Sequence, residues 1–136
     1  MDRTLIIVKP DGVQRGLVGV ILERFEARGL RLVAGEIRTL DAAVAKAHYG
    51  EHEGKPFFDR LVTFITSGPV FVGVLEGPEG TFQLVRTMMG ATNPVDAAPG
   101  TIRGDLATSM AENLIHGSDS LDSAAREMAL FFPHLV

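Results

Sequence analysis

One stretch organises the sequence, Asn113-Leu114-Ile115-His116-Gly117-Ser118-Asp119-Ser120, in which a short apolar strand ends at a histidine and is followed by a glycine turn. Ser120, or Asp122 beyond it, can cap a helix that begins directly afterwards. The free N–H groups and positive partial charge of a helix N-terminus would suit an anionic group arriving at the imidazole. His116 is therefore the candidate functional histidine, whereas the histidines at 48, 52 and 134 are expected to be structural or solvated.

Three earlier segments also predict strands. Residues 4–8 form an apolar run that is rich in β-branched side chains and closes in a turn at Lys9-Pro10-Asp11-Gly12, which places Lys9 at the end of the strand. Residues 70–75 are apolar on both faces, which is typical of a central strand. The segment that begins at Leu30 alternates until Gly35, where the phase slips as it does at a β-bulge.

Apolar residues at helical spacing predict helices between these strands. A helix from Val18 ends at Gly29, and a second, capped by Asp41, runs through Tyr49. Another begins at Pro56, and a fourth contains Phe82, Val85 and Met89. The expected buried faces are Phe57, Leu61, Phe64 and Ile65 in the helix after Pro56, and Leu121, Ala124, Ala125 and Met128 in the last helix. Residues 90–104 hold three glycines and two prolines without a period, and such long loops are usually functional.

The composition describes one globular domain over residues 1–136. Apolar residues make up 46% of the chain and charged residues 22%, and there is no cysteine, which excludes disulfide scaffolds and thiolate chemistry. No apolar stretch is long enough for a membrane span or a secretory signal, so we expect a cytoplasmic protein. The net charge of −4 argues against nucleic acid as the main ligand.

Positive charge is scarce after residue 61. Only Arg86, Arg103 and Arg126 occur there, and the first two flank the glycine- and proline-rich loop. If these two converge, they form a local anion site on an acidic surface; otherwise they are ordinary surface arginines. Neither of the common glycine-rich phosphate-binding motifs is present, so a nucleotide site in this chain would need another design.

The stretch around His116 resembles the signature N-x-x-H-G-S-D-[ST] of nucleoside diphosphate kinases. Three other segments resemble that family in the same order along the chain. Residues 5–11 are similar to its opening strand and lysine, Pro56-Phe57-Phe58 to its base-stacking helix, and Thr92-Asn93-Pro94 together with residues 99–105 to its long loop. The similarity extends from about residue 3 to residue 132.

The resemblance implies transfer of the terminal phosphate of a nucleoside triphosphate to a nucleoside diphosphate. The reaction would pass through a phosphohistidine at His116 with ping-pong kinetics, and Mg²⁺ would be carried by the nucleotide rather than by a protein metal site. Glu127 would orient the imidazole. The other implied roles are hydroxyls near the histidine for Tyr49 and Ser118, phosphate contacts for Lys9, Arg86, Thr92 and Arg103, a sugar and phosphate contact for Asn113, and stacking on any base for Phe57.

The order of predicted elements alone also allows a doubly wound parallel sheet. The resemblance instead implies an α+β fold, with a ferredoxin-like βαββαβ core, an antiparallel four-stranded sheet and flanking helices. Ala91 stands where many members of the family have Glu, a change expected to affect the surface of the loop. The resemblance also implies a homo-oligomer. The sequence ends at Val136, without the longer tail that many relatives use in subunit contacts, so the size of the oligomer, tetramer or hexamer, stays open.

Two other functional classes compete with this hypothesis. A nucleotide-binding regulatory module on the same fold would bind nucleotides without forming a phosphoenzyme. A nucleic-acid-binding protein would use the same anion site for backbone phosphates and would show a steep salt dependence.

Overall fold

The computed structural model describes residues 1–135 and contains a four-stranded sheet in the order β2-β3-β1-β4. Its strands are β1 (Asp2–Val8), β2 (Arg31–Arg38), β3 (Val70–Gly77) and β4 (Ile115–Gly117). Every neighbouring pair of strands is antiparallel, which confirms the ferredoxin-like alternative and rules out the doubly wound parallel sheet.

Seven α-helices accompany the strands within residues 1–135. They are α1 (Pro10–Gln14), α2 (Val18–Ala27), α3 (Ala42–His48), α4 (Phe58–Ile65), α5 (Thr81–Met89), α6 (Ile102–Leu106) and α7 (Leu121–Phe131), with single 3-10 turns at Gly50–His52, Pro94–Asp96 and Pro133–Leu135. None of the helices in this part of the chain is both long and apolar enough to cross a membrane.

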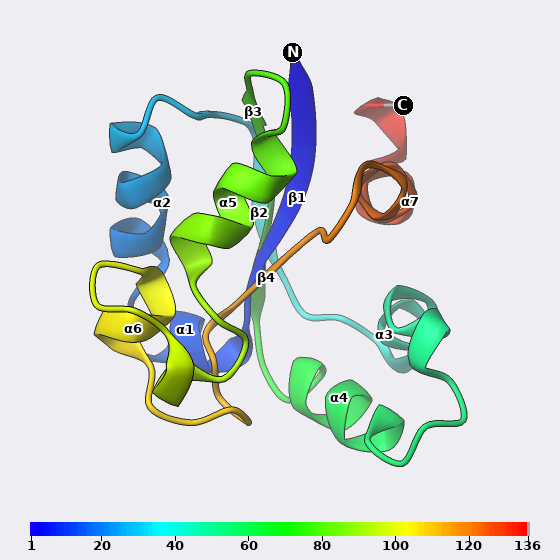
Figure 1. The fold of residues 1–136 in the computed structure, drawn as a ribbon. Coiled ribbons are helices and arrows are strands. Elements are labelled where there is room, and N and C mark those ends of the chain that lie inside the picture. Colours follow the sequence, from blue (N-terminus) through cyan, green and yellow to red (C-terminus); the bar gives the residue numbers. More distant parts are fainter. Residues whose placement is uncertain (136) are drawn as a thin grey trace.

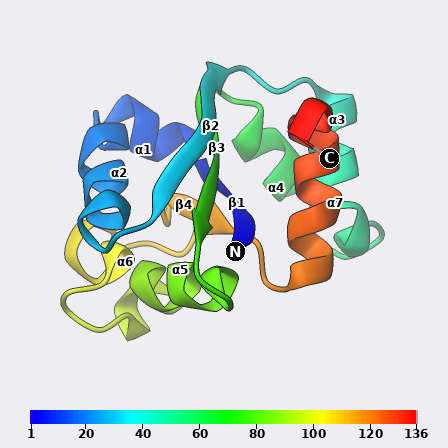
Figure 2. The same ribbon diagram turned by 90° about the horizontal axis from the view of Figure 1, so that it is seen from above.

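The helices cover both faces of the sheet. In Figures 1 and 2, α3, α4 and α7 lie on one side, and α1, α2, α5 and α6 lie on the other. The side chains of β1 alternate between two apolar clusters, with Leu5 and Ile7 in the cluster under α3, α4 and α7 and Ile6 and Val8 in the cluster under α2 and α5. A strand buried on both faces explains why residues 4–8 are continuously apolar.

The strand predictions were correct in type and inexact in detail. Strand β3 lies between β2 and β1, as its apolar composition indicates. The irregularity in β2 falls between Leu32 and Ala34 rather than at Gly35, because Leu32 pairs with Leu75 and Ala34 with Val74, so one residue of β2 has no partner in the register.

The helix predictions erred mainly in which face is buried. In α7 the buried residues are Ala124, Glu127 and Phe131, while Leu121 is 56% exposed. A carboxylate at the centre of the buried face breaks the apolar periodicity from which that face was predicted. Helix α4 starts at Phe58 rather than at Pro56 and buries Phe58, Val62 and Ile65, which leaves Phe57, Leu61 and Phe64 partly exposed.

Two segments expected to be irregular are helical. The turn after β1 is the short helix α1, since a proline is well tolerated in a first helical turn. The long loop carries α6, whose N-cap Thr101 accepts a hydrogen bond from the N–H of Gly104. A side chain on Gly104 would collide with the backbone carbonyl of Ala98, so this glycine allows the loop to fold back on itself.

An unusual backbone conformation sets the start of β4. Leu114 has a φ of +74°, a left-handed conformation that costs energy for a residue with a branched side chain. Its N–H donates to Oδ2 of Asp11 over 3.1 Å, and its carbonyl accepts from the N–H of Lys9 over 2.8 Å. These two bonds attach the entry to β4 to the end of β1.

We predict that Asp11→Ala lowers the free energy of unfolding by about 1 to 3 kcal/mol, because the buried N–H of Leu114 loses its acceptor. Urea unfolding followed by circular dichroism measures the change. Asp11→Asn keeps a carbonyl oxygen at the same place and should lose less stability. Equal losses in the two variants would show that the bond to Leu114 does not fix this segment.

Candidate active site

A chain of three hydrogen-bonded side chains forms the centre of the site. Nε2 of His116 lies 3.0 Å from Oε1 of Glu127, and the hydroxyl of Ser118 donates to the same carboxylate oxygen over 2.7 Å. Since a carboxylate can only accept, the imidazole proton belongs on Nε2 and the lone pair on Nδ1. The His116 side chain is 22% exposed, whereas Glu127 and Ser118 are buried.

Glu127 is ionised in spite of its burial. Desolvation alone would raise the pKa of this carboxyl group, but the hydrogen bonds from His116 and Ser118 and the positive charge of a protonated His116 outweigh it, so the net pKa lies below its usual value. A carboxylate at this place stabilises any positive charge that develops on the imidazole.

A cavity of about 220 Å³ opens beside His116 and is lined by three cationic side chains. Lys9 comes from the end of β1, Arg86 from α5 and Arg103 from α6. Nζ of Lys9 donates to Oδ1 of Asn113 over 2.8 Å, and a guanidinium N–H of Arg86 donates to the carbonyl of Gly117 over 3.0 Å. The cations predicted from distant parts of the sequence therefore converge, and each is held by the protein.

Arg103 is the most deeply buried of the three cations. Its guanidinium group donates to the carbonyls of Asn113 (3.2 Å), Gly90 (3.1 Å) and Ile115 (2.6 Å). Arg103 thus connects Gly90, at the start of the long loop, to Asn113 and Ile115, the residues on either side of Leu114. Three of its five N–H donors are used in this way, which leaves two for another acceptor.

The cations are crowded and short of counter-charge. Burial, followed by repulsion from Arg103, lowers the pKa of Lys9 to about 8, against a smaller opposing effect of Asp11. Burial and the charge of Arg86 likewise lower the pKa of Arg103 to about 10. Uncompensated positive charge at the mouth of a cavity favours an anion with several negative oxygens.

The remaining polar residues predicted for the site also lie at this cavity. Tyr49, Thr92 and Asn113 line it, and the side-chain amide of Asn113 donates to the carbonyl of Thr92 over 3.0 Å. Burial and the nearby charge of Glu127 raise the pKa of Tyr49 to about 12, so its hydroxyl keeps its proton.

Phe57 lies outside the set of cavity-lining side chains within residues 1–135. It contacts His52, which lines the cavity, with ring centroids 5.3 Å apart. Nζ of Lys55 lies 3.2 Å from Nδ1 of His52 and 5.8 Å from the centre of the Phe57 ring. Phe57 is therefore joined to the cavity through His52, a residue expected from the sequence to be structural or solvated.

His48 is the second histidine that the sequence did not mark. It is buried, its ring centroid lies 4.6 Å from that of His116, and neither of its ring nitrogens has a hydrogen-bond partner in the described part of the chain. Burial, and then repulsion from a protonated His116, lowers its pKa to about 3, so the ring is neutral. The only feature of the sequence that could have placed His48 near the site is its position next to Tyr49.

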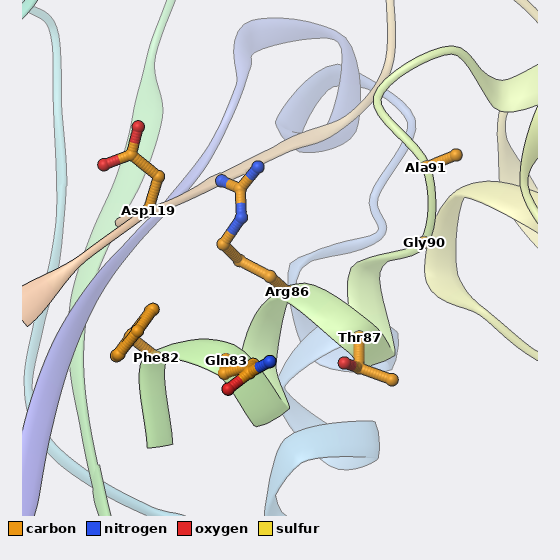
Figure 3. Close-up of a pocket in the computed structure, with 7 residues that line it drawn as sticks. All are labelled: Phe82, Gln83, Arg86, Thr87, Gly90, Ala91 and Asp119. Atoms are coloured by element: carbon orange, nitrogen blue, oxygen red, sulfur yellow. The ribbon is translucent and has the colours of Figure 1, made fainter. Parts of the chain in front are cut away.

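A second, more open pocket of about 570 Å³ adjoins the first. Both pockets include Arg86 and Asp119 in their walls, and Figure 3 shows the Arg86 guanidinium between Asp119 and Ala91. Ala91, which stands where many members of the family have Glu, is exposed and lines this second pocket and not the cavity beside His116.

A neutral imidazole with a carboxylate behind it and cations in front can attack phosphorus and stabilise the charge that develops. The antiparallel α+β fold and this site define a phosphotransferase with a histidine nucleophile. The family model for nucleoside diphosphate kinase matches residues 2–135. The chain belongs to the nucleoside diphosphate kinase family.

Individual relatives are similar over nearly their whole length. The nucleoside diphosphate kinase of Parafrankia sp. (strain EAN1pec) is 59% identical over 134 residues, which cover 98% of this chain and 97% of the relative. The one from Haloarcula marismortui is 59% identical over 133 residues, with 96% and 86% covered.

Two solved structures have the same fold. The halophilic nucleoside diphosphate kinase from Halobacterium salinarum, in complex with CDP, has a TM-score of 0.93 and 56% identity and covers 96% of this chain and 87% of that one. A nucleoside diphosphate kinase family protein from Babesia bovis has a TM-score of 0.94 and 50% identity, with coverages of 98% and 90%.

The family assignment confirms the predicted activity. The protein is an enzyme that transfers phosphate from a nucleoside triphosphate to a nucleoside diphosphate through a phosphohistidine. The alternative of a regulatory module without transfer chemistry is thereby set aside.

Arg86 and Arg103 differ in how much of the fold depends on them, and this difference is testable. We predict that Arg103→Ala lowers the free energy of unfolding by about 2 to 4 kcal/mol, because three carbonyls lose a charged donor. Arg86→Ala removes one such bond and should cost half as much or less. Urea unfolding of both variants in phosphate-free buffer makes the comparison, and equal losses would contradict the anchoring of the loop by Arg103.

Proposed function

We propose that His116 is the phosphate-carrying residue of this enzyme and that Lys9, Arg86 and Arg103 hold the phosphates during transfer. One observation carries the proposal. The hydrogen bond from Nε2 to Glu127 leaves the Nδ1 lone pair as the only nucleophile on the ring, beside a cavity lined by the three cations.

In the first half-reaction Nδ1 of His116 attacks the terminal phosphorus of a nucleoside triphosphate. The Nδ1–P bond forms as the bond from phosphorus to the bridging oxygen breaks, and the electron pair leaves with the nucleoside diphosphate. The proton on Nε2 stays in place, so the ring gains a positive charge that Glu127 faces across 3.0 Å. Ser118 donates to the same carboxylate and keeps it in place.

The second half-reaction reverses these steps with another nucleoside diphosphate. Its terminal phosphate oxygen attacks the phosphorus, and the electron pair of the Nδ1–P bond returns to the ring. Because one cavity serves both nucleotides, they bind in turn, which gives ping-pong kinetics. Most of the catalysis comes from fixed cations that stabilise the anionic transition state.

We also propose that Mg²⁺ enters the site on the phosphates of the nucleotide. The cavity wall is rich in cationic nitrogens, and its carboxylates besides Glu127 are Glu51 and Asp119. Mg²⁺ prefers six oxygen ligands and usually keeps several waters, so this donor set suits an ion held largely by phosphate oxygens. When bound, the ion would neutralise phosphate charge.

The base would lie at the outer end of the cavity, against Phe57. An aromatic face accepts any base, which supports broad nucleotide tolerance. Thr92 and Asn113 would contact phosphate and sugar from the cavity wall, and Tyr49 would support the imidazole side of the site. The CDP complex of the Halobacterium salinarum enzyme is consistent with a nucleotide ligand for this fold.

Three broader assignments belong to the same proposal. Residues 1–136 would form one catalytic domain, supported by the family match over residues 2–135 and by a single sheet shared by both apolar clusters; Val136 lies outside the described residues. The enzyme would work in the cytoplasm as a homo-oligomer. Its mass in solution distinguishes a tetramer from a hexamer.

Phosphoenzyme formation tests the assignment of His116. Incubation with Mg·ATP alone should leave one acid-labile phosphate per chain, and His116→Ala should leave none, because the other imidazole beside Glu127, that of His48, is buried and has no hydrogen bond to the carboxylate within residues 1–135. The exposed His134 provides the control, since His134→Ala should label like the parent. Mass spectrometry of intact protein at alkaline pH measures the label. Stoichiometric phosphate on His116→Ala would refute the assignment.

The lowered pKa of Lys9 predicts a pH dependence of nucleotide binding. Below pH 8 the ammonium group is charged and attracts phosphate, and above its pKa of about 8 it is increasingly neutral. The affinity for ADP, measured by calorimetry between pH 7 and 9.5, should therefore fall as the pH rises through 8. Lys9→Gln should bind more weakly at pH 7 and lose this dependence. An unchanged slope in that variant would show that another group titrates.

A further inference from the structure

We propose that His48, His116 and Glu127 form a binding site for a divalent transition-metal ion of the Zn²⁺ type. Metal binding at this site and phosphorylation of His116 would exclude each other. The second statement rests on the assignment of His116 as the phosphate carrier, and the first does not.

The three side chains supply two imidazole nitrogens and one carboxylate oxygen, and these donor atoms all lie within 4.8 Å of one another. Two of the separations are shorter: Nε2 of His116 is 3.0 Å from Oε1 of Glu127, and Nδ1 of His48 is 4.0 Å from Oε2 of the same carboxylate. A tetrahedral Zn²⁺ with bonds of about 2.1 Å keeps its donors roughly 3.4 Å apart. The widest pair of donors, which lies within 4.8 Å, would have to approach by at most about 1.4 Å on metal binding.

The unsatisfied ring nitrogens of His48 indicate that this site binds a ligand. Its side chain is 1% exposed, and neither ring nitrogen has a hydrogen-bond partner within residues 1–135. Buried polar groups are almost always paired, so an unpaired one suggests a missing partner. An imidazole nitrogen without a proton has the lone pair that a metal ion requires.

The donor set selects the class of metal. Two imidazoles and a carboxylate match the three protein ligands of many zinc sites, which leave a fourth position for water or substrate. The cavity of about 220 Å³ is lined by all three side chains and has room for that fourth ligand. Mg²⁺ prefers oxygen donors in octahedral geometry, so it should not compete here.

The charges around the cavity limit the affinity. Lys9, Arg86 and Arg103 line the same cavity and repel a cation, and one guanidinium nitrogen of Arg126 lies 3.7 Å from Oε2 of Glu127. The site should therefore bind Zn²⁺ more weakly than a dedicated structural zinc site, and comparison among variants is the informative measurement.

The exclusion follows from the proton on His116. A metal on Nε2 displaces the N–H that faces Glu127, and the neutral ring then carries its proton on Nδ1. That nitrogen has lost the lone pair needed to attack phosphorus. Conversely, a phosphorylated ring that keeps its proton on Nε2 offers the metal no donor from His116.

Equilibrium dialysis of the nucleotide-free protein against Zn²⁺ in a non-chelating buffer tests the site. The parent should bind one ion per chain, and His48→Phe, which keeps a ring of similar shape, should bind more than about tenfold more weakly, because even partners behind the ligands are worth ~10–100-fold in affinity. His134→Ala is the control for a histidine outside the cluster and should bind like the parent. No binding by the parent, or equal binding by His48→Phe, would overturn the proposal.

Two measurements on the unaltered sequence remain decisive if His48→Phe does not fold. Co²⁺ added to the parent should give the visible absorption of a tetrahedral site, and octahedral spectra throughout the titration would count against the site. Phosphoenzyme made with Mg·ATP and freed of nucleotide should bind no Zn²⁺ at this site, and binding equal to that of the parent would refute the exclusion. If no phosphoenzyme forms, the assignment of His116 fails, while zinc binding that depends on His48 would still stand.

Discussion

The hydrogen bond between Nε2 of His116 and Glu127 is the interaction on which the site depends, because it fixes both the tautomer and the direction of the ring. It requires an ionised carboxylate in a buried place, where desolvation works against the charge. Ser118 meets part of that cost with a second hydrogen bond. A short turn joins β4 to α7, and this connection lets Glu127 of α7 reach back to His116 and Ser118, which lie 11 and 9 residues earlier in the chain.

On the other side of the imidazole, positive charges lie close together and repel one another. Lys9, Arg86 and Arg103 come from three different elements and are pressed together without enough negative charge nearby. Backbone carbonyls hold two of these cations, and the amide of Asn113 holds the third. In the free enzyme these cations repel one another, and the negative charge of a bound polyphosphate would offset that repulsion. Cations that are already in place before the reaction contribute to catalysis by electrostatic preorganisation.

Much of this arrangement could be predicted from the sequence. The ordered motifs gave the family and hence the antiparallel sheet, and apolar runs located β1 and β3. Periodicity alone did not predict the burial of Glu127, which interrupts the apolar face of its helix; the resemblance, and not the pattern, placed it beside the imidazole. His48 was expected only to be structural or solvated, and nothing in the pattern indicated that it lies against His116. Pattern analysis also missed α1 and α6, because helices of five residues depend on caps and tertiary contacts more than on periodicity.

Leu114 shows why such a site resists piecemeal redesign. Its left-handed backbone is tolerable because the side chain is fully buried and because both of its backbone polar groups are bonded, to Asp11 and Lys9. Glycine would relax the backbone and leave a cavity in the core, while exchange of Asp11 would leave the N–H of Leu114 without its acceptor. Substitutions at these neighbouring positions are therefore tolerated only in combination. Related sequences should show paired, compensating substitutions at the junction of β1 and β4 rather than independent ones.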